Sequence, residues 1–198
     1  MRLEILTNGL NSVQRLQLRL IKQLIGHQVG PIAMQSYRPD FFGHPFNKCV
    51  AEALRGVQYW HKAEAELLAA FVSKNNRCTY CMGAHTAIAV HGFATATVEA
   101  ALANWRDAPL REPLRLTLGF LEKLTVSPTA VIADDVAALY QAGVSEQGVH
   151  EAIAICFVFC TINRLADAFE FEMPSPASYR RLGFTLYNMG YGLAVLPG

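Results

Sequence analysis

The sequence has few charged residues and almost no excess of either sign. Of its 198 residues, 17% are charged and 52% are hydrophobic, and the formal net charge is +1. The basic residues are scattered, so the chain lacks the positive patch that attracts nucleic acid or an acidic membrane surface. We therefore expect neither nucleic acid nor a membrane among its partners.

Long apolar runs are also missing. The N-terminal stretch, residues 1–23, carries charges throughout and does not resemble a signal peptide. The longest internal run, AIAICFVFCTI at 152–162, is shorter than the ~20 residues of a membrane-spanning helix. Both absences predict a cytoplasmic protein. Thiols stay reduced in that compartment, so we expect no structural disulfide among the five cysteines, which are Cys49, Cys78, Cys81, Cys156 and Cys160.

The sequence contains no alternating pattern typical of a strand, and no glycine-rich or haem-attachment motif that would indicate a cofactor. Helical patterns cover most of its length instead. Without a long linker, the chain is predicted to be one all-α domain over 1–198, with an N-terminal helix and arm at 1–45 and a core at 46–198. The expected helices are 11–25, 46–56, 61–76, 78–91, 95–104, 110–125, 132–141, 145–170 and 175–190.

The first helix, at 11–25, shows an amphipathic spacing. Its apolar stripe is expected to face inward and its basic residues outward. The stripe is Val13, Leu16, Leu20 and Leu24, and the basic residues are Arg15, Arg19 and Lys22. The stretch at 26–46 holds three prolines and three glycines, which predicts an irregular connector.

Three reactive residues lie close together in NNRCTYCMGAH, residues 75–85. At 100° per residue, Cys78, Cys81 and His85 fall within about 60° on one face of a helix. Two cysteines three residues apart can form and break a disulfide with little backbone movement. The start of a helix also favours a thiolate, because its exposed N–H groups and dipole stabilise negative charge.

A carboxylate on the preceding helix can reach the same face. If Asn75 and Asn76 turn the chain into an antiparallel helical hairpin, Glu66 lies ~14 Å back from the turn and His85 lies ~10 Å beyond it. A carboxylate, an imidazole and two thiols on facing helices form a proton relay suited to thiol chemistry. We therefore predict Glu66, Cys78, Cys81 and His85 as site residues.

The spacing Glu66-x11-Cys78-x2-Cys81-x3-His85 resembles the active-site motif of the alkylhydroperoxidase D-like (AhpD-like) branch of the carboxymuconolactone decarboxylase family. Other stretches resemble its peroxidase-related subfamily. These are YRPDFF (37–42), AELLAAFVSKNNRCTYC (65–81), FLEKLTVSP (120–128), CTINRLADAFEFEMP (160–174) and LYNMGYG (186–192). The resemblance implies an AhpD-like helical bundle built around the hairpin, and assembly as a dimer, trimer or hexamer.

The resemblance also implies a peroxiredoxin-type antioxidant enzyme that reduces hydroperoxides through a Cys78–Cys81 disulfide. Glu66 and His85 carry the protons, and an external dithiol, either a dihydrolipoyl group or a thioredoxin-like protein, restores the thiols. The second cysteine attacks in the family. The helix dipole favours Cys78 instead, but His85 at i+4 favours Cys81, and we predict Cys81. Tyr80 departs from the family, because alkylhydroperoxidase D proteins have a second histidine there.

Other interpretations of the motif remain open. Cys78, Cys81 and His85 could bind zinc with His61, His91 or Cys49, although structural zinc usually takes a second, distant ligand pair, which is missing here. Functional alternatives are a redox-sensing or thiol–disulfide exchange protein without substantial turnover, and a cofactor-free lactone decarboxylase, whose chemistry needs no cysteine pair. Cys156 and Cys160, in an apolar helix, are expected to be inert core residues.

Overall fold

The computed structural model describes residues 8–191, and this range contains helices and turns but no strand. The predicted all-α class is confirmed. The described α-helices are α2 (Ser12–Ile25), α3 (Gly30–Tyr37), α4 (His44–Arg55), α5 (Lys62–Asn75), α6 (Thr79–Ala89), α7 (Thr95–Ala103), α8 (Glu112–Val126), α9 (Ala133–Gln141), α10 (Glu146–Ala168) and α11 (Pro176–Met189).

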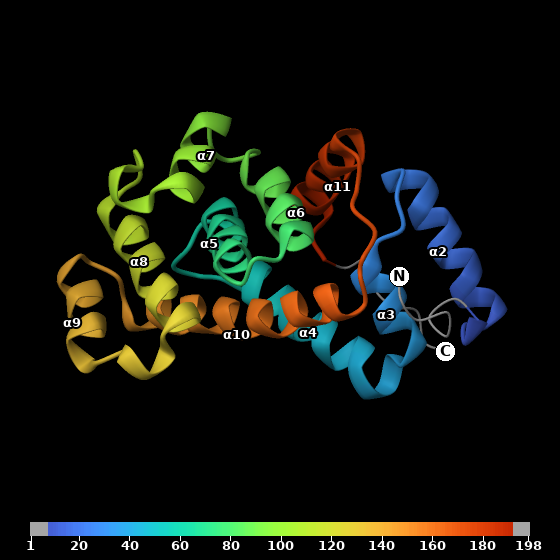
Figure 1. The fold of residues 1–198 in the computed structure, drawn as a ribbon, viewed down its shortest axis with the longest axis horizontal. Coiled ribbons are helices and arrows are strands. Elements are labelled where there is room, and N and C mark those ends of the chain that lie inside the picture. Colours follow the sequence, from blue (N-terminus) through green and yellow to red (C-terminus); the bar gives the residue numbers. More distant parts are fainter. Residues whose placement is uncertain (1–7, 192–198) are drawn as a thin grey trace.

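Helix α5 is the centre of the bundle (Figure 1). It packs against α6, α8 and α10, and every side chain from Ala63 to Ser73 is buried. Helix α6 in turn packs against α11, while α2 and α3 lie at the far end of the molecule from α8 and α9. A polar side chain in the stretch from Ala63 to Ser73 is therefore buried within the protein.

The predicted hairpin is confirmed as α5 and α6. Helix α5 begins at a capping box, in which the Ala63 N–H donates to His61 Nδ1 at 3.3 Å and the His61 N–H donates to Glu64 Oε2 at 2.9 Å. It ends at Asn75, and Arg77 takes a left-handed conformation with φ of 61°. The Cys78 N–H then returns to the Ser73 carbonyl at 2.9 Å, so the chain reverses within a few residues.

The prediction of an irregular connector at 26–46 is wrong. This stretch forms α3 and a π-helical turn at Pro39–Gly43, which leads directly into α4. Pro31 and Pro45 occupy the first turns of α3 and α4. Proline is tolerated there because the N–H that it lacks has no partner within the helix. The prolines therefore begin helices in this stretch.

The first helix forms as predicted, but the face that it buries is not the predicted one. Its buried apolar side chains are Leu18, Ile21 and Ile25. Helix α2 has two neighbouring apolar stripes, and the core covers the stripe with these three residues, not the predicted one. The predicted stripe is mostly exposed: Val13 by 58%, Leu16 by 57%, Leu20 by 56% and Leu24 by 53%.

Helix α10 is, among the described helices, the one whose length and composition would allow it to cross a membrane. This helix of 23 residues packs against α4, α5 and α8, and 56% of its most apolar 18-residue stretch is buried inside the protein. The predicted single domain over 1–198 includes residues 1–7 and 192–198, which lie outside the described range, and it stays a prediction.

The central position of α5 gives a test by mutation. Phe71 is fully buried on α5, so Phe71→Ala is expected to lower the free energy of unfolding by about 3–5 kcal/mol, through lost burial and a residual cavity. Phe157 is 64% exposed, and Phe157→Ala is expected to change it by less than about 0.5 kcal/mol. Urea unfolding of both variants measures the difference. Equal losses would contradict the placement of α5.

Candidate active site

Glu66 lies at the centre of a buried polar cluster. Its side chain has no solvent exposure. One carboxylate oxygen, Oε1, accepts hydrogen bonds from Arg55 Nη1 at 2.6 Å and from the Tyr191 hydroxyl at 2.9 Å. The other, Oε2, accepts from His85 Nδ1 at 2.6 Å. The structure thus brings the predicted Glu66 and His85 together and adds two residues that the sequence did not predict.

Arg55 and Tyr191 are these two added residues. Arg55 also donates from Nη1 to the Leu54 carbonyl at 2.8 Å and from Nη2 to the Leu186 carbonyl at 2.9 Å, so it links α4, α5 and α11. Burial of the Tyr191 hydroxyl and the charge of Glu66 raise the pKa of Tyr191 well above its usual range. Tyr191 therefore keeps its proton and donates a hydrogen bond to the carboxylate.

The hydrogen bond to Glu66 sets the tautomer of His85. Because Nδ1 donates to the carboxylate, Nε2 carries the lone pair of the neutral ring and can accept a proton. The ring is held edge-on against Phe159 at a centroid distance of 4.5 Å and stacks with Tyr191 at 6.5 Å. The His85 ring is thus held in one orientation, with Nδ1 bound to Glu66 and Nε2 on the opposite edge of the ring.

The two cysteines lie at the start of α6. Cys78 is the N-cap residue and Cys81 the third residue of the helix, and both are buried. The Cys81 thiol lowers the pKa of Cys78 by hydrogen bonding to its sulfur, against the opposing effects of burial and of the Asp167 charge. The same interaction and burial raise the pKa of Cys81 well above its usual range. Of the two thiols, Cys78 is therefore the one that loses its proton more readily.

An apolar cavity of about 100 Å³ opens beside the second cysteine. Cys81 and His85 both line it, together with apolar side chains that include Ile21, Ile25, Phe159 and Leu182. Cys78 is not part of its wall and has no solvent exposure. Acidity and access are thus divided between the two sulfurs: Cys78 is the stronger acid, and Cys81 is the one that a ligand in the cavity would touch.

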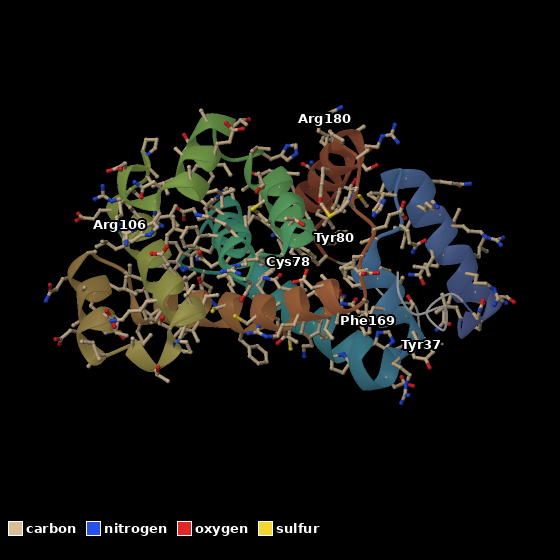
Figure 2. The ribbon with its side chains drawn as sticks, viewed as in Figure 1. Tyr37, Cys78, Tyr80, Arg106, Phe169 and Arg180 are labelled. Atoms are coloured by element: carbon tan, nitrogen blue, oxygen red, sulfur yellow. The ribbon has the colours of Figure 1, made fainter. Side chains whose placement is uncertain are left out.

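Tyr80 takes the position where the family has a second histidine. Its hydroxyl accepts a hydrogen bond from the Gly30 N–H at 3.3 Å, and its ring packs edge-on against Phe171 at 5.3 Å. Figure 2 shows Tyr80 and Cys78 near the middle of the molecule. Burial raises the pKa of Tyr80 well above its usual range, so this residue cannot serve as a proton acceptor. Tyr80 therefore shapes the cavity wall.

The three residues considered as a fourth zinc ligand have other surroundings. His61 caps α5, His91 stacks on the Tyr187 ring at 5.2 Å, and Cys49 is exposed. Within residues 8–191, no group of three or more His, Cys, Asp or Glu side chains is arranged to hold a metal ion.

The ion pair between Arg55 and Glu66 gives a second test. Arg55→Met leaves a buried carboxylate without its cation, and is expected to lower the free energy of unfolding by about 3–5 kcal/mol. Adding Glu66→Gln removes the unpaired charge and should recover part of that loss in urea unfolding. The control is Arg106, which is 63% exposed and pairs with Glu122 at 3.5 Å, so Arg106→Met should cost less than ~1 kcal/mol. Additive losses in the double variant would contradict the pairing.

Known proteins resemble this chain in structure. No family model and no curated protein matches its sequence. An uncharacterized peroxidase-related protein from Silicibacter sp. TM1040 is 21% identical, with a TM-score of 0.77 over 91% of this chain and 95% of that one.

Two further structures share this arrangement of helices. The alkylhydroperoxidase AhpD core protein from Ralstonia eutropha JMP134, also an uncharacterized peroxidase-related protein, is 22% identical, with a TM-score of 0.72 over 87% of this chain and 92% of that one. The debrominase Bmp8 is 19% identical, with a TM-score of 0.68 over 86% and 90%. At these identities the likeness concerns the fold. The chain has the AhpD-like fold that its motif predicted.

Proposed function

We propose that this protein is a cysteine-based peroxidase that reduces hydroperoxides through Cys78 and Cys81. The observation that carries this proposal is the placement of Cys81 and His85 on the wall of one apolar cavity, with His85 held from behind by Glu66. A nucleophile and a base at i and i+4 of one helix, with the base oriented by a carboxylate, form a recognised catalytic arrangement.

In the first proposed step, Cys81 attacks the hydroperoxide. His85 Nε2 takes the thiol proton, and the Cys81 sulfur attacks the outer oxygen of the O–O bond. The bond breaks, the alkoxide leaves, and His85 returns the proton to it as the alcohol. Cys81 is then a sulfenic acid. Glu66 stabilises the imidazolium in between, while Arg55 and Tyr191 hold the carboxylate in place.

In the second step, Cys78 resolves the sulfenic acid. The hydrogen bond from Cys81 lowers the pKa of Cys78, which favours its thiolate; this thiolate attacks the Cys81 sulfur and expels hydroxide, which solvent protonates to water. An external dithiol then reduces the disulfide. Because Cys78 has 0% and Cys81 2% exposure, a slender dithiol such as a dihydrolipoyl group fits this task better than the broad surface of a thioredoxin-like protein.

Removal of a halogen is a second candidate for the same thiols. The apolar cavity beside Cys81 and the structural likeness to the debrominase Bmp8 favour it. A cysteine sulfur would take the halogen from a haloaromatic ring, and the ring carbon would gain a proton. The other sulfur would then displace halide to form the disulfide. A lactone decarboxylase would use neither cysteine. Decarboxylation of a lactone that survives replacement of both Cys78 and Cys81 would therefore indicate that chemistry instead.

The oligomeric state and the cellular location of the protein belong to the same proposal. We expect a homo-oligomer in the cytoplasm, where its thiols stay reduced between turnovers. Four exposed apolar side chains along α2, namely Val13, Leu16, Leu20 and Leu24, support assembly, since a row of this kind commonly marks an interface.

The peroxidase proposal is tested by thiol loss with one equivalent of cumene hydroperoxide. A Cys49→Ser/Cys160→Ser background removes the two cysteines that are at least partly exposed. We expect rapid loss of two thiols, abolished by Cys81→Ser and slowed roughly 10²-fold by Glu66→Gln, the lower range for general acid–base catalysis. A halogenated pyrrole in a parallel reaction tests dehalogenation. Thiols that persist, or disappear equally slowly in every variant, would exclude the peroxidase.

The order of the two cysteines is tested in the single variants. Cys78→Ser should accumulate a sulfenic acid at Cys81, which dimedone traps for mass analysis. A trapped sulfenic acid at Cys78 in the Cys81→Ser variant would reverse the two roles and leave the peroxidase proposal intact.

A further inference from the structure

A second pair of thiols lies on α10. The sulfur atoms of Cys156 and Cys160 are 3.8 Å apart. Cys156 is buried, as the sequence predicted, but the prediction for Cys160 is wrong, because its side chain is partly exposed. The difference follows from the helix: Cys160 shares a stripe with Phe157 and Arg164, which are both exposed, three residues before it and four after it. Cys160 therefore packs against the core on one side and reaches the surface on the other.

Hydrogen-bond donors surround the Cys160 sulfur. The Cys156 thiol lies against it, and Asn76 Nδ2 approaches it at 3.5 Å from the turn between α5 and α6. Arg164, one turn further along α10, donates to the Cys160 carbonyl and brings its positive charge close. The hydrogen bond from Cys156 lowers the pKa of Cys160 against the effect of burial, and Asn76 and Arg164 lower it further.

Cys156 has the opposite character. Its interaction with Cys160 and its burial raise its pKa, while the Thr125 hydroxyl lies 3.6 Å from its sulfur. The partly exposed sulfur is thus the more acidic of the two, with a pKa lowered to about 5. A thiolate is the nucleophilic form of cysteine.

This pair is separate from the proposed catalytic pair. Asp167, whose charge acts on Cys78, lies on α10 two turns beyond Cys160. At ~1.5 Å per residue, those seven residues place it ~10 Å along the helix. The two pairs thus have different neighbours: Asn76 approaches the Cys160 sulfur, whereas Cys78 interacts with Cys81 and Asp167.

We propose that Cys160 is a second reactive thiol of this chain, which forms mixed disulfides with small disulfides of the glutathione class. The Cys160 thiolate attacks one sulfur of the small disulfide and forms a new S–S bond. The original S–S bond breaks, and the leaving thiolate takes a proton from solvent. The small disulfide is the oxidant, so the step needs no further reactant.

The mixed disulfide is expected to persist. Side chains at i and i+4 of a helix have Cβ atoms ~5–6 Å apart, whereas a disulfide requires ~3.5–4.5 Å. Cys156 therefore cannot displace the attached group by bonding to Cys160 unless α10 distorts. An external thiol has to remove it, which makes Cys160 a modification site.

The experiment treats the reduced, full-length protein with oxidised glutathione at pH 6 and maps the modified peptides by mass. Cys49, an exposed thiol of the same chain, is the internal reference. We expect one glutathionyl group on Cys160, added roughly 10-fold faster than at Cys49, because a thiolate remains available at this pH. Cys160→Ser should abolish it. Modification of Cys49 alone, or a Cys156–Cys160 disulfide as the product, would overturn the proposal.

Two matched variants test the role of the neighbouring thiol. Cys156→Ser keeps a hydrogen-bond donor beside Cys160, whereas Cys156→Ala removes it. Alkylation of Cys160 by iodoacetamide across a pH series should follow the native profile in the serine variant and shift to higher pH in the alanine variant. Identical profiles would contradict the assigned donor. Peroxide-driven loss of the Cys78 and Cys81 thiols should proceed unchanged in Cys160→Ser, which separates this site from the proposed peroxidase.

Discussion

The buried carboxylate of Glu66 is the constraint on which the site depends. A charge with no solvent exposure is strongly unfavourable unless ion pairing and hydrogen bonds replace its hydration. Its partners come from three places: Arg55 at the end of α4, His85 on α6, and Tyr191 just beyond α11. The carboxylate is satisfied only when these segments close around α5. Closure of the bundle around α5 therefore also fixes the orientation of the histidine.

Part of this arrangement could be predicted from the sequence because it is local. The hairpin follows from a helix-breaking pair, Asn75 and Asn76, between two helical patterns, and the spacing around it brings Glu66 to His85. Arg55 and Tyr191 were missed for a physical reason. Tyr191 is 125 residues from Glu66 in the chain, and Arg55 ends an ordinary helix, so neither contact leaves a local pattern. The closing LYNMGYG stretch, which includes Tyr191, was the one available signal.

The error at α2 has a related cause. Periodicity shows that a helix has an apolar stripe, but packing decides which stripe the core covers. Helix α2 carries two such stripes, and the one with Ile21 and Ile25 lines the cavity beside Cys81. The predicted connector at 26–46 rests on proline as a helix breaker, whereas Pro31 and Pro45 lie where a helix tolerates proline. Element positions were thus predictable from local sequence, and their contacts were not.

The two cysteine pairs show how backbone position alone changes what a thiol pair can do. Cys78 is an N-cap residue with extended dihedral angles, φ of −86° and ψ of 95°, so its side chain is free of the helical geometry that fixes Cys81. Its sulfur can approach Cys81 without distorting α6. Cys156 and Cys160 both lie inside α10, where the helix holds their Cβ atoms apart. In each pair the interaction between the two thiols lowers the pKa of one and raises that of the other. A disulfide can form between Cys78 and Cys81, whereas the helix obstructs one between Cys156 and Cys160. A disulfide cycle therefore suits the start of α6, and a persistent adduct suits α10.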